Sequence, residues 1–247
     1  LRERDGVRAF WLDGRETLKG GSMALVTRRV GESNAPEVVV DGDVCSCCQT
    51  SAAMTRAGPI VVYRDHRDGE IRDISIVRRT KDGWTDPAPV HRDGWEIPGC
   101  PVNGPSADSS GSLSAVAWYT CAGGKPRVLV AFSRDDGASF APPIVIDDAR
   151  PLGRVSVACV AGGAAVCWLA RRGERAAISL CRVTTEGSLG EVLVLGTTGA
   201  SRAAGFPRMV RSGNSLVLVW RELADVPRLR SALVDALASR KPIGSGR

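Results

Sequence analysis

Cysteines are the residues of this sequence best suited to chemistry. The chain holds eight of them, and five stand in expected connecting segments: Cys45, Cys47, Cys48, Cys100 and Cys121. Closely placed thiolates bind soft or borderline ions such as Cu(I) and Zn(II), whereas paired cysteines form disulfides that pin long loops. We therefore predict a copper or zinc site with Cys45, Cys47, Cys48 and Cys100 as ligands, or disulfides among these residues.

A densely charged segment, residues 64–73, is expected beside these cysteines. His66 lies within it and could add a nitrogen ligand to the metal site. The residues expected to line a ligand site are Arg64, Asp65, Arg72, Asp73, Trp95 and Asn103. No catalytic residue is assigned, because no base with an orienting partner stands out beside a nucleophilic thiol.

Charge and hydropathy exclude two classes of partner. The net charge is +6, but the arginines are scattered rather than gathered into a stripe, so we expect no nucleic acid ligand. No run approaches the roughly 20 apolar residues of a membrane span.

Eight cysteines favour an oxidising compartment, so we expect a periplasmic or secreted protein. Since no signal-like run follows Leu1, we expect a mature form or a fragment.

The elements that must position these residues follow a repeat of about fifty residues. An aromatic residue ends an apolar run at five positions: Trp11, Tyr63, Trp118, Trp168 and Trp220. Successive members lie 50 to 55 residues apart. Short strands bounded by glycine, proline and aspartate at this interval are typical of all-β folds, and four strands per unit match a propeller blade.

We predict an all-β fold, a single β-propeller domain over residues 1–247 with four-stranded antiparallel blades. The expected blades, complete or partial, span residues 1–40, 49–91, 105–146, 155–195 and 206–235. The first is expected to lack its innermost strand and the last its outermost. Because an open ring exposes sheet edges, we expect N-terminal sequence to be missing and the full protein to have six blades.

Propeller connectivity brings the cysteines and the charged segment together. The connections between the second and third strands of each blade, and those leading from one blade to the next, open on one face. We call it the loop face. All five cysteines of the connecting segments and residues 64–73 are expected there.

One turn carries a family resemblance. Residues 133–140 fit the pattern Ser-x-Asp-x-Gly-x-Ser/Thr-Trp/Phe through Ser133, Asp135, Gly137 and Phe140. The chain therefore resembles the bacterial sialidase-like (Asp-box, or BNR-repeat) propellers, including a group with Cys-x-Cys-Cys and Gly-Cys-Pro-x-x-Gly-Pro elements. The resemblance implies a sialidase-like propeller in which the box is structural, holding a tight turn.

Sialidase catalysis is implied less well. Sialidases use an arginine triad, a tyrosine nucleophile paired with a glutamate, and an aspartate acid–base. This chain has only two tyrosines, Tyr63 and Tyr119, and none in its last two blades. The pattern of a sialidase active site is thus incomplete.

Three functions remain open. The first is an extracytoplasmic propeller that binds a small molecule, glycan or metal ion on the loop face. The second is a sialidase-type exo-glycosidase with Arg64 and Arg72 as carboxylate anchors. The third is a non-catalytic protein-interaction scaffold. The oligomeric state is not predicted.

Overall fold

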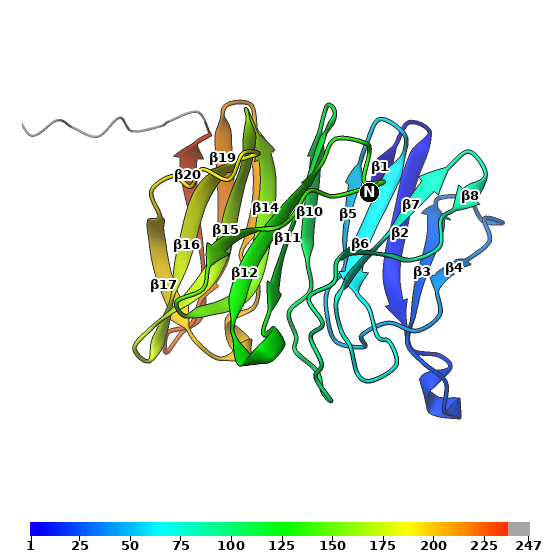
Figure 1. The fold of residues 1–247 in the computed structure, drawn as a ribbon, viewed down its shortest axis with the longest axis horizontal. Coiled ribbons are helices and arrows are strands. Elements are labelled where there is room, and N and C mark those ends of the chain that lie inside the picture. The colour runs from blue at the N-terminus through cyan, green and yellow to red at the C-terminus, as the bar shows by residue number, and fades with distance from the viewer. Residues whose placement is uncertain (237–247) are drawn as a thin grey trace, which may run out of the picture.

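The computed structural model describes residues 1–236, which form five antiparallel sheets placed side by side along the molecule (Figure 1). Sheet 1 contains β1 (Arg2–Glu3), β2 (Gly6–Asp13), β3 (Ala24–Val30) and β4 (Val38–Asp41). Sheet 2 contains β5 (Ser51–Met54), β6 (Pro59–Arg64), β7 (Ile74–Thr80), β8 (Gly83–Trp84) and β9 (Ala88–His91). Sheet 3 contains β10 (Ser106–Ser110), β11 (Leu113–Thr120), β12 (Arg127–Ser133) and β13 (Ile144–Asp147).

Sheet 4 contains β14 (Pro151–Val160), β15 (Gly163–Arg172), β16 (Arg175–Thr184) and β17 (Leu193–Gly199). Sheet 5 contains β18 (Arg208–Ser212), β19 (Ser215–Glu222) and β20 (Arg228–Asp235). Three short 3₁₀ turns lie in the connections: η1 (Thr17–Lys19), η2 (Ala122–Gly124) and η3 (Arg202–Ala204). In residues 1–236, no helix is both long and apolar enough to cross a membrane.

The prediction of an all-β fold built from antiparallel sheets is confirmed. One expectation was wrong: sheet 1 does have an innermost strand, because β1 pairs with β2 through Arg2 and Val7. Two polar residues carry no apolar pattern, so this strand leaves no periodic signal in the sequence.

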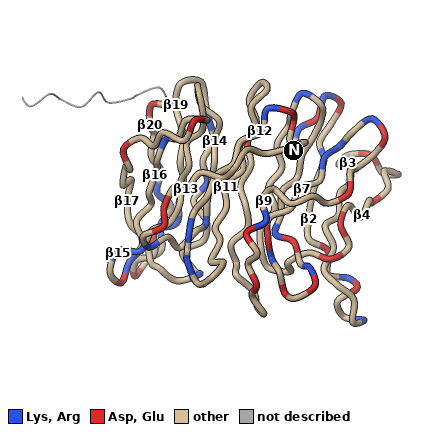
Figure 2. Tube along the Cα trace, viewed as in Figure 1, with Lys and Arg blue, Asp and Glu red and all other residues tan. Residues whose placement is uncertain are grey.

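Four hydrophobic clusters join each sheet to the next one along the chain. The second strands of sheets 2, 3 and 4 are covered on both faces, and β6 is buried over its whole length. Within residues 1–236, none of the four clusters joins sheet 1 to sheet 5. Charged residues of both signs lie mainly at strand ends and in loops (Figure 2).

Hydrogen bonds from the repeated aromatic residues cross between neighbouring sheets. Three of the five aromatic residues donate to an aspartate at or just beyond the end of the previous sheet's outer strand. The bonds are Tyr63 Oη to Asp41 Oδ2 (2.5 Å), Trp118 Nε1 to Asp93 Oδ2 (2.6 Å) and Trp168 Nε1 to Asp147 Oδ2 (2.7 Å). Trp220 breaks the series: its buried Nε1 has no partner within residues 1–236. The repeat thus marks an aromatic–carboxylate bridge, not apolar packing alone.

Serine hydroxyls on the inner strands form a second series of bridges. Each serine accepts a backbone N–H of the next inner strand. The bonds are Ala107 N to Ser51 Oγ (3.0 Å), Val157 N to Ser106 Oγ (3.1 Å) and Met209 N to Ser156 Oγ (3.1 Å). Neighbouring sheets are therefore tied both at the inner strands and near the loop face.

The turn at residues 133–140 is held by one carboxylate. Asp135 Oδ1 accepts the Ser133 hydroxyl at 2.7 Å and the Ser139 N–H at 2.9 Å, and Oδ2 accepts the Ser139 hydroxyl at 2.5 Å. These bonds, above all the one from the Ser139 hydroxyl, lower the pKa of Asp135 from 3.8 to about 2. Gly137 has φ 81°, a conformation that favours glycine, and Phe140 packs against the cluster between sheets 2 and 3.

The bridge from Trp168 is expected to contribute to stability. Trp168→Phe and Trp220→Phe remove the same atoms from buried sites, but only Trp168 loses a hydrogen bond. We expect Trp168→Phe to lower the free energy of unfolding by about 1–2 kcal/mol more than Trp220→Phe. Denaturant unfolding of both variants measures the difference, and equal losses would contradict the role of the bridge.

The Asp135 turn is expected to make stability depend on acid pH. Since the folded pKa lies below the ordinary value, its contribution is present above about pH 4 and is lost as pH falls towards about 2. Asp135→Asn should lower Tm at pH 7, and its deficit from wild type should shrink between pH 4 and pH 2. A deficit independent of pH would contradict this linkage. Asp148→Asn, at an exposed position, is the control.

Candidate functional site

The loop face lies at the lower end of the molecule in Figure 1, where η1, η2 and η3 are found. It is built by the turns that follow each second strand and by the connections between sheets. Its main segments are residues 14–23, 42–50, 65–73, 92–105, 121–126, 148–150 and 200–207. The predicted metal and ligand residues come from three of these segments, 42–50, 65–73 and 92–105, and from Arg64 at the end of β6.

Four of the five loop-face cysteines meet. The sulfur atoms of Cys45, Cys47 and Cys48 all lie within 4.8 Å of one another. Cys47 forms a disulfide with Cys100, with the two Cα atoms 6.1 Å apart, so the structure adopts the disulfide alternative for two of the four predicted metal ligands. Cys121 is a free, half-buried thiol at the end of β11, outside this group.

Cys45 and Cys48 remain free and are buried. Their sulfur atoms are 3.2 Å apart. A hydrogen bond from Cys48 lowers the pKa of Cys45 against the opposing effect of burial, and a hydrogen bond from Arg72 adds to the lowering. The same bond, together with burial, raises the pKa of Cys48. Cys45 is therefore the more acidic thiol of the pair.

Arg64 is enclosed beneath the cysteines at 1% exposure. Its guanidinium donates to the carbonyl oxygens of Asn103 (2.8 Å), Tyr119 (2.7 Å) and Arg72. It also lies 4.7 Å from the centre of the Trp95 ring, a cation–π contact. Burial lowers the pKa of Arg64. These contacts join sheets 2 and 3, so Arg64 braces the loop face from inside.

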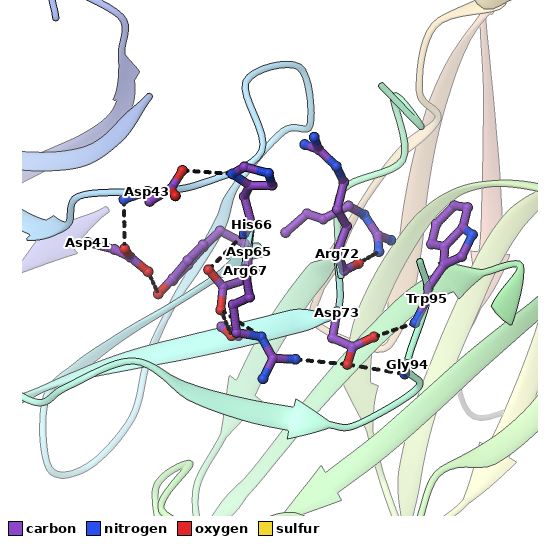
Figure 3. A network of polar contacts seen from close by, with 12 residues as sticks. Asp41, Asp43, Asp65, His66, Arg67, Arg72, Asp73, Gly94 and Trp95 are labelled. Atoms are coloured by element: carbon purple, nitrogen blue, oxygen red, sulfur yellow. Dashed lines mark hydrogen bonds and ion pairs between the residues drawn. The ribbon is translucent and has the colours of Figure 1, made fainter. Parts of the chain in front are cut away.

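The predicted ligand residues Asp65, Asp73 and Trp95 are also buried and bonded within the chain (Figure 3). Asp73 accepts the N–H groups of Gly94 (3.2 Å) and Trp95 (3.0 Å) and a bond from Arg67 (3.0 Å). Asp65 accepts the Ser75 hydroxyl at 2.7 Å, and burial raises its pKa. These carboxylates fix the shape of residues 64–73 and 92–95, and their binding of a ligand stays a prediction.

His66 does not join the group of cysteine sulfur atoms among the described residues. Its Nδ1 lies 2.9 Å from Asp43 and its Nε2 3.4 Å from Glu70, as Figure 3 shows for the Asp43 contact. These two carboxylates, Asp43 first, raise the pKa of His66. Glu70 in turn accepts a bond from Arg72 at 2.7 Å. His66 therefore belongs to a carboxylate network and lies outside the metal-like group of cysteines.

Asn103 connects the Cys100 segment to sheet 4. Its Oδ1 accepts the Arg154 N–H at 2.7 Å, and its Nδ2 donates to the Leu152 carbonyl at 3.2 Å. A Cβ at Gly153 would lie 2.4 Å from Asn103 Oδ1, so the contact requires glycine there. Val102 and Arg154 have φ of 49° and 54°, which costs energy in non-glycine residues and often marks functional positions.

Three arginines that were not among the predicted site residues lie within or beside residues 200–205. Arg154 donates to the Ser201 carbonyl (2.7 Å), Arg202 to the Cys100 carbonyl (3.2 Å) and Arg221 to the Ala203 carbonyl (3.1 Å). Within residues 1–236, no carboxylate lies within 4.0 Å of any of the three guanidinium groups. The only sequence signal is a charged residue, Arg154, at the start of an otherwise apolar run.

Arg154 is the strongest electrostatic feature of this group. It is only 7% exposed, and both burial and the neighbouring charge of Arg202 lower its pKa. Buried cations are normally paired with an anion. The surroundings of Arg154 thus favour a negatively charged ligand.

A cavity of about 650 Å³ lies along the inner strands β5, β10, β14 and β18. Its lining is largely polar and includes Ser51, Ser106, Asp108, Ser156, Arg208 and Arg211. Such a volume is within the range of small-molecule sites.

Neither the known protein families nor the curated proteins include a match to this sequence. Among solved structures, the chain is similar to the endosialidase of phage phi92, with a TM-score of 0.58 and 9% identity over 91% of this chain and 42% of that one. It is also similar to an α-L-arabinofuranosidase from Podospora anserina in complex with cellotriose (TM-score 0.50, 10% identity, 93% of this chain and 87% of that one).

A third similar structure is the catalytic domain of an α-L-arabinofuranosidase from Coprinopsis cinerea, with a TM-score of 0.50 and 13% identity over 94% of this chain and 88% of that one. The chain spans less than half of the endosialidase and 40% of a xylan β-1,4-xylosidase from Bacillus halodurans. At these identities the similarity shows the fold alone, an all-β fold of repeated antiparallel sheets.

Proposed function

We propose that this chain binds an acidic glycan on its loop face, with Arg154 and Arg202 holding the carboxylate of the sugar. The observation that carries the proposal is Arg154, a buried guanidinium whose charged neighbour is another arginine. A carboxylate at this position would supply the missing counter-charge and accept the paired N–H groups that arginine presents.

The similar structures support a sugar as the bearer of that carboxylate. The proteins of known structure with this fold include an endosialidase and arabinofuranosidases.

Arg154 and Arg202 replace Arg64 and Arg72 as the proposed carboxylate anchors. Arg64 uses its guanidinium on three carbonyl groups, and Arg72 is paired with Glu70. Arg154 and Arg202 have no such anionic partner among the described residues.

The loop face does not bring together the groups of sialidase-type hydrolysis within residues 1–236. Glycoside hydrolysis needs two groups flanking the scissile bond, and sialidases use a tyrosine paired with a glutamate. Tyr63 is buried and donates to Asp41, whereas burial, followed by the neighbouring Cys121, raises the pKa of Tyr119 to about 12. Within residues 1–236, neither hydroxyl has a glutamate partner.

Binding is expected to depend on the two arginines. Titration calorimetry with sialyl- and glucuronyl-oligosaccharides, against neutral oligosaccharides of the same length, measures the preference for acidic sugars. Arg202→Met and Arg154→Met should each weaken acidic-glycan binding at least about tenfold, the effect of losing a charge-assisted hydrogen bond. Arg134→Met, at the turn after β12 on the opposite end, should bind as wild type does.

Arg202 is exposed, so its variant tests the proposal even if Arg154→Met does not fold. Equal affinity for acidic and neutral glycans, or unchanged binding by Arg202→Met, would contradict the proposal. A fluorogenic sialoside assay run alongside is expected to show no turnover, since no tyrosine–glutamate pair is in place in the described part of the chain, residues 1–236.

A second candidate function is binding of a soft metal ion, favoured by the three sulfur atoms of Cys45, Cys47 and Cys48 within 4.8 Å. Fully reduced protein, in which Cys47 is a thiol, should bind about one equivalent of Cu(I) or Zn(II). Plasma mass spectrometry after desalting measures it, and a Cys47→Ser/Cys48→Ser variant should lose the metal. Metal-free reduced protein would exclude this function.

A further inference from the structure

The four clustered cysteines differ in how accessible they are. Cys45 and Cys48 are 1% and 2% exposed, Cys47 is half-buried and Cys100 is exposed. Cys45 and Cys48 also have the Cys-x-x-Cys spacing, in which two thiols of one turn can be oxidised to a disulfide. A buried dithiol therefore lies behind a disulfide that reaches the surface.

The sulfur atoms are close enough to react with one another. Cys45 Sγ lies 3.2 Å from Cys48 Sγ and 3.8 Å from Cys47 Sγ, and Cys47 Sγ lies 4.0 Å from Cys48 Sγ. Thiol–disulfide exchange proceeds by attack of a thiolate on a disulfide sulfur, so its first need is this proximity. Holding both groups in one site further replaces a bimolecular step with an intramolecular one.

We propose that these four cysteines form a thiol–disulfide exchange site, in which the Cys47–Cys100 disulfide converts internally to a Cys45–Cys48 disulfide.

The conversion is balanced without an external oxidant. The thiolate of Cys45 attacks Sγ of Cys47, forming a Cys45–Cys47 bond and releasing Cys100 as a thiolate, which takes up a proton. Cys48, giving up its proton, then attacks Sγ of Cys45 and releases Cys47 as a thiolate. One disulfide and two thiols are present before and after, so no net oxidation occurs.

Two arginines compensate the negative charge of the reacting sulfur atoms. The charge of Arg72 acts on Cys45, and the buried charge of Arg64 acts on Cys48. Arg64 has no carboxylate partner within 4.0 Å in the part of the chain that the structure describes. A thiolate formed among these sulfur atoms therefore lies near the positive charge of Arg64.

The exchange changes what the loop face presents. In the structure, the disulfide ties residues 42–50 to the segment that carries Asn103. In the exchanged form this tie is absent, the new bond closes within residues 45–48, and Cys100 becomes an exposed thiol. Cys100, as a thiolate, would then attack an external disulfide, forming a mixed disulfide and releasing one external thiol, while the buried pair stores the oxidised state.

Mapping a single disulfide tests the proposal. The reduced protein is oxidised with one equivalent of diamide and equilibrated without oxygen. Samples are then quenched with acid, alkylated with light N-ethylmaleimide, reduced and alkylated with the heavy reagent. Tandem mass spectrometry shows which pair carried the disulfide. We expect both isomers in wild type, the Cys45–Cys48 form in at least roughly one single-disulfide molecule in ten, with a ratio that becomes constant.

Three variants serve as controls. Cys45→Ser should hold the disulfide at Cys47–Cys100 at all times, and Cys100→Ser should give the Cys45–Cys48 disulfide. Cys121→Ser, whose sulfur lies outside the group, should match wild type. The wild-type measurement stands even if a variant fails to fold. Light label on both Cys45 and Cys48 in every wild-type molecule with one disulfide would overturn the proposal.

Discussion

The fold depends on a hydrogen bond that crosses from one sheet to the next. An aromatic residue at the end of a central strand donates to an aspartate that ends the previous sheet, as Trp118 does to Asp93 and Trp168 to Asp147. A buried N–H without an acceptor costs more than a bond gains, so this pairing fixes how neighbouring sheets sit. The connections that make the loop face start from these same strand ends.

The loop face contains residues whose hydrogen bonds are complete within the chain and, at Arg154, a buried charge with no carboxylate partner within residues 1–236. Asp65, Asp73 and Arg64 complete their hydrogen bonds within the chain and therefore act as framework. Arg154 differs because, within residues 1–236, its guanidinium donates to a carbonyl oxygen alone and its charged neighbour is Arg202. A framework residue uses its polar atoms in hydrogen bonds within the chain, whereas a binding residue keeps some of its donors for the ligand. That distinction places the acidic-glycan proposal at sheets 4 and 5 rather than at sheet 2.

Asn103 connects the cysteine group of the loop face to its arginine group. Its segment carries Cys100, its carbonyl accepts Arg64, and its side chain holds the backbone of Arg154. The left-handed conformations of Val102 and Arg154 are kept by these contacts. The cysteine group and the arginine group are thus attached to one segment, although each has its own ligand chemistry and its own test.

The sequence by itself determined the class of fold, because strand period and the spacing of Tyr63, Trp118, Trp168 and Trp220 are local, repeated signals. It also showed that cysteines gather at one face, because connectivity follows from the repeat. It did not show β1, whose two polar residues carry no pattern, or the aspartates that bridge to the aromatic residues. Tertiary structure alone decided that Cys47 pairs with Cys100, that Arg64 is buried and bonded to carbonyl groups, and that Arg154 is buried with no carboxylate partner within residues 1–236. Whether a charged residue is framework or site depends on the partners within a few ångströms, and those partners come from segments about fifty residues away in the sequence.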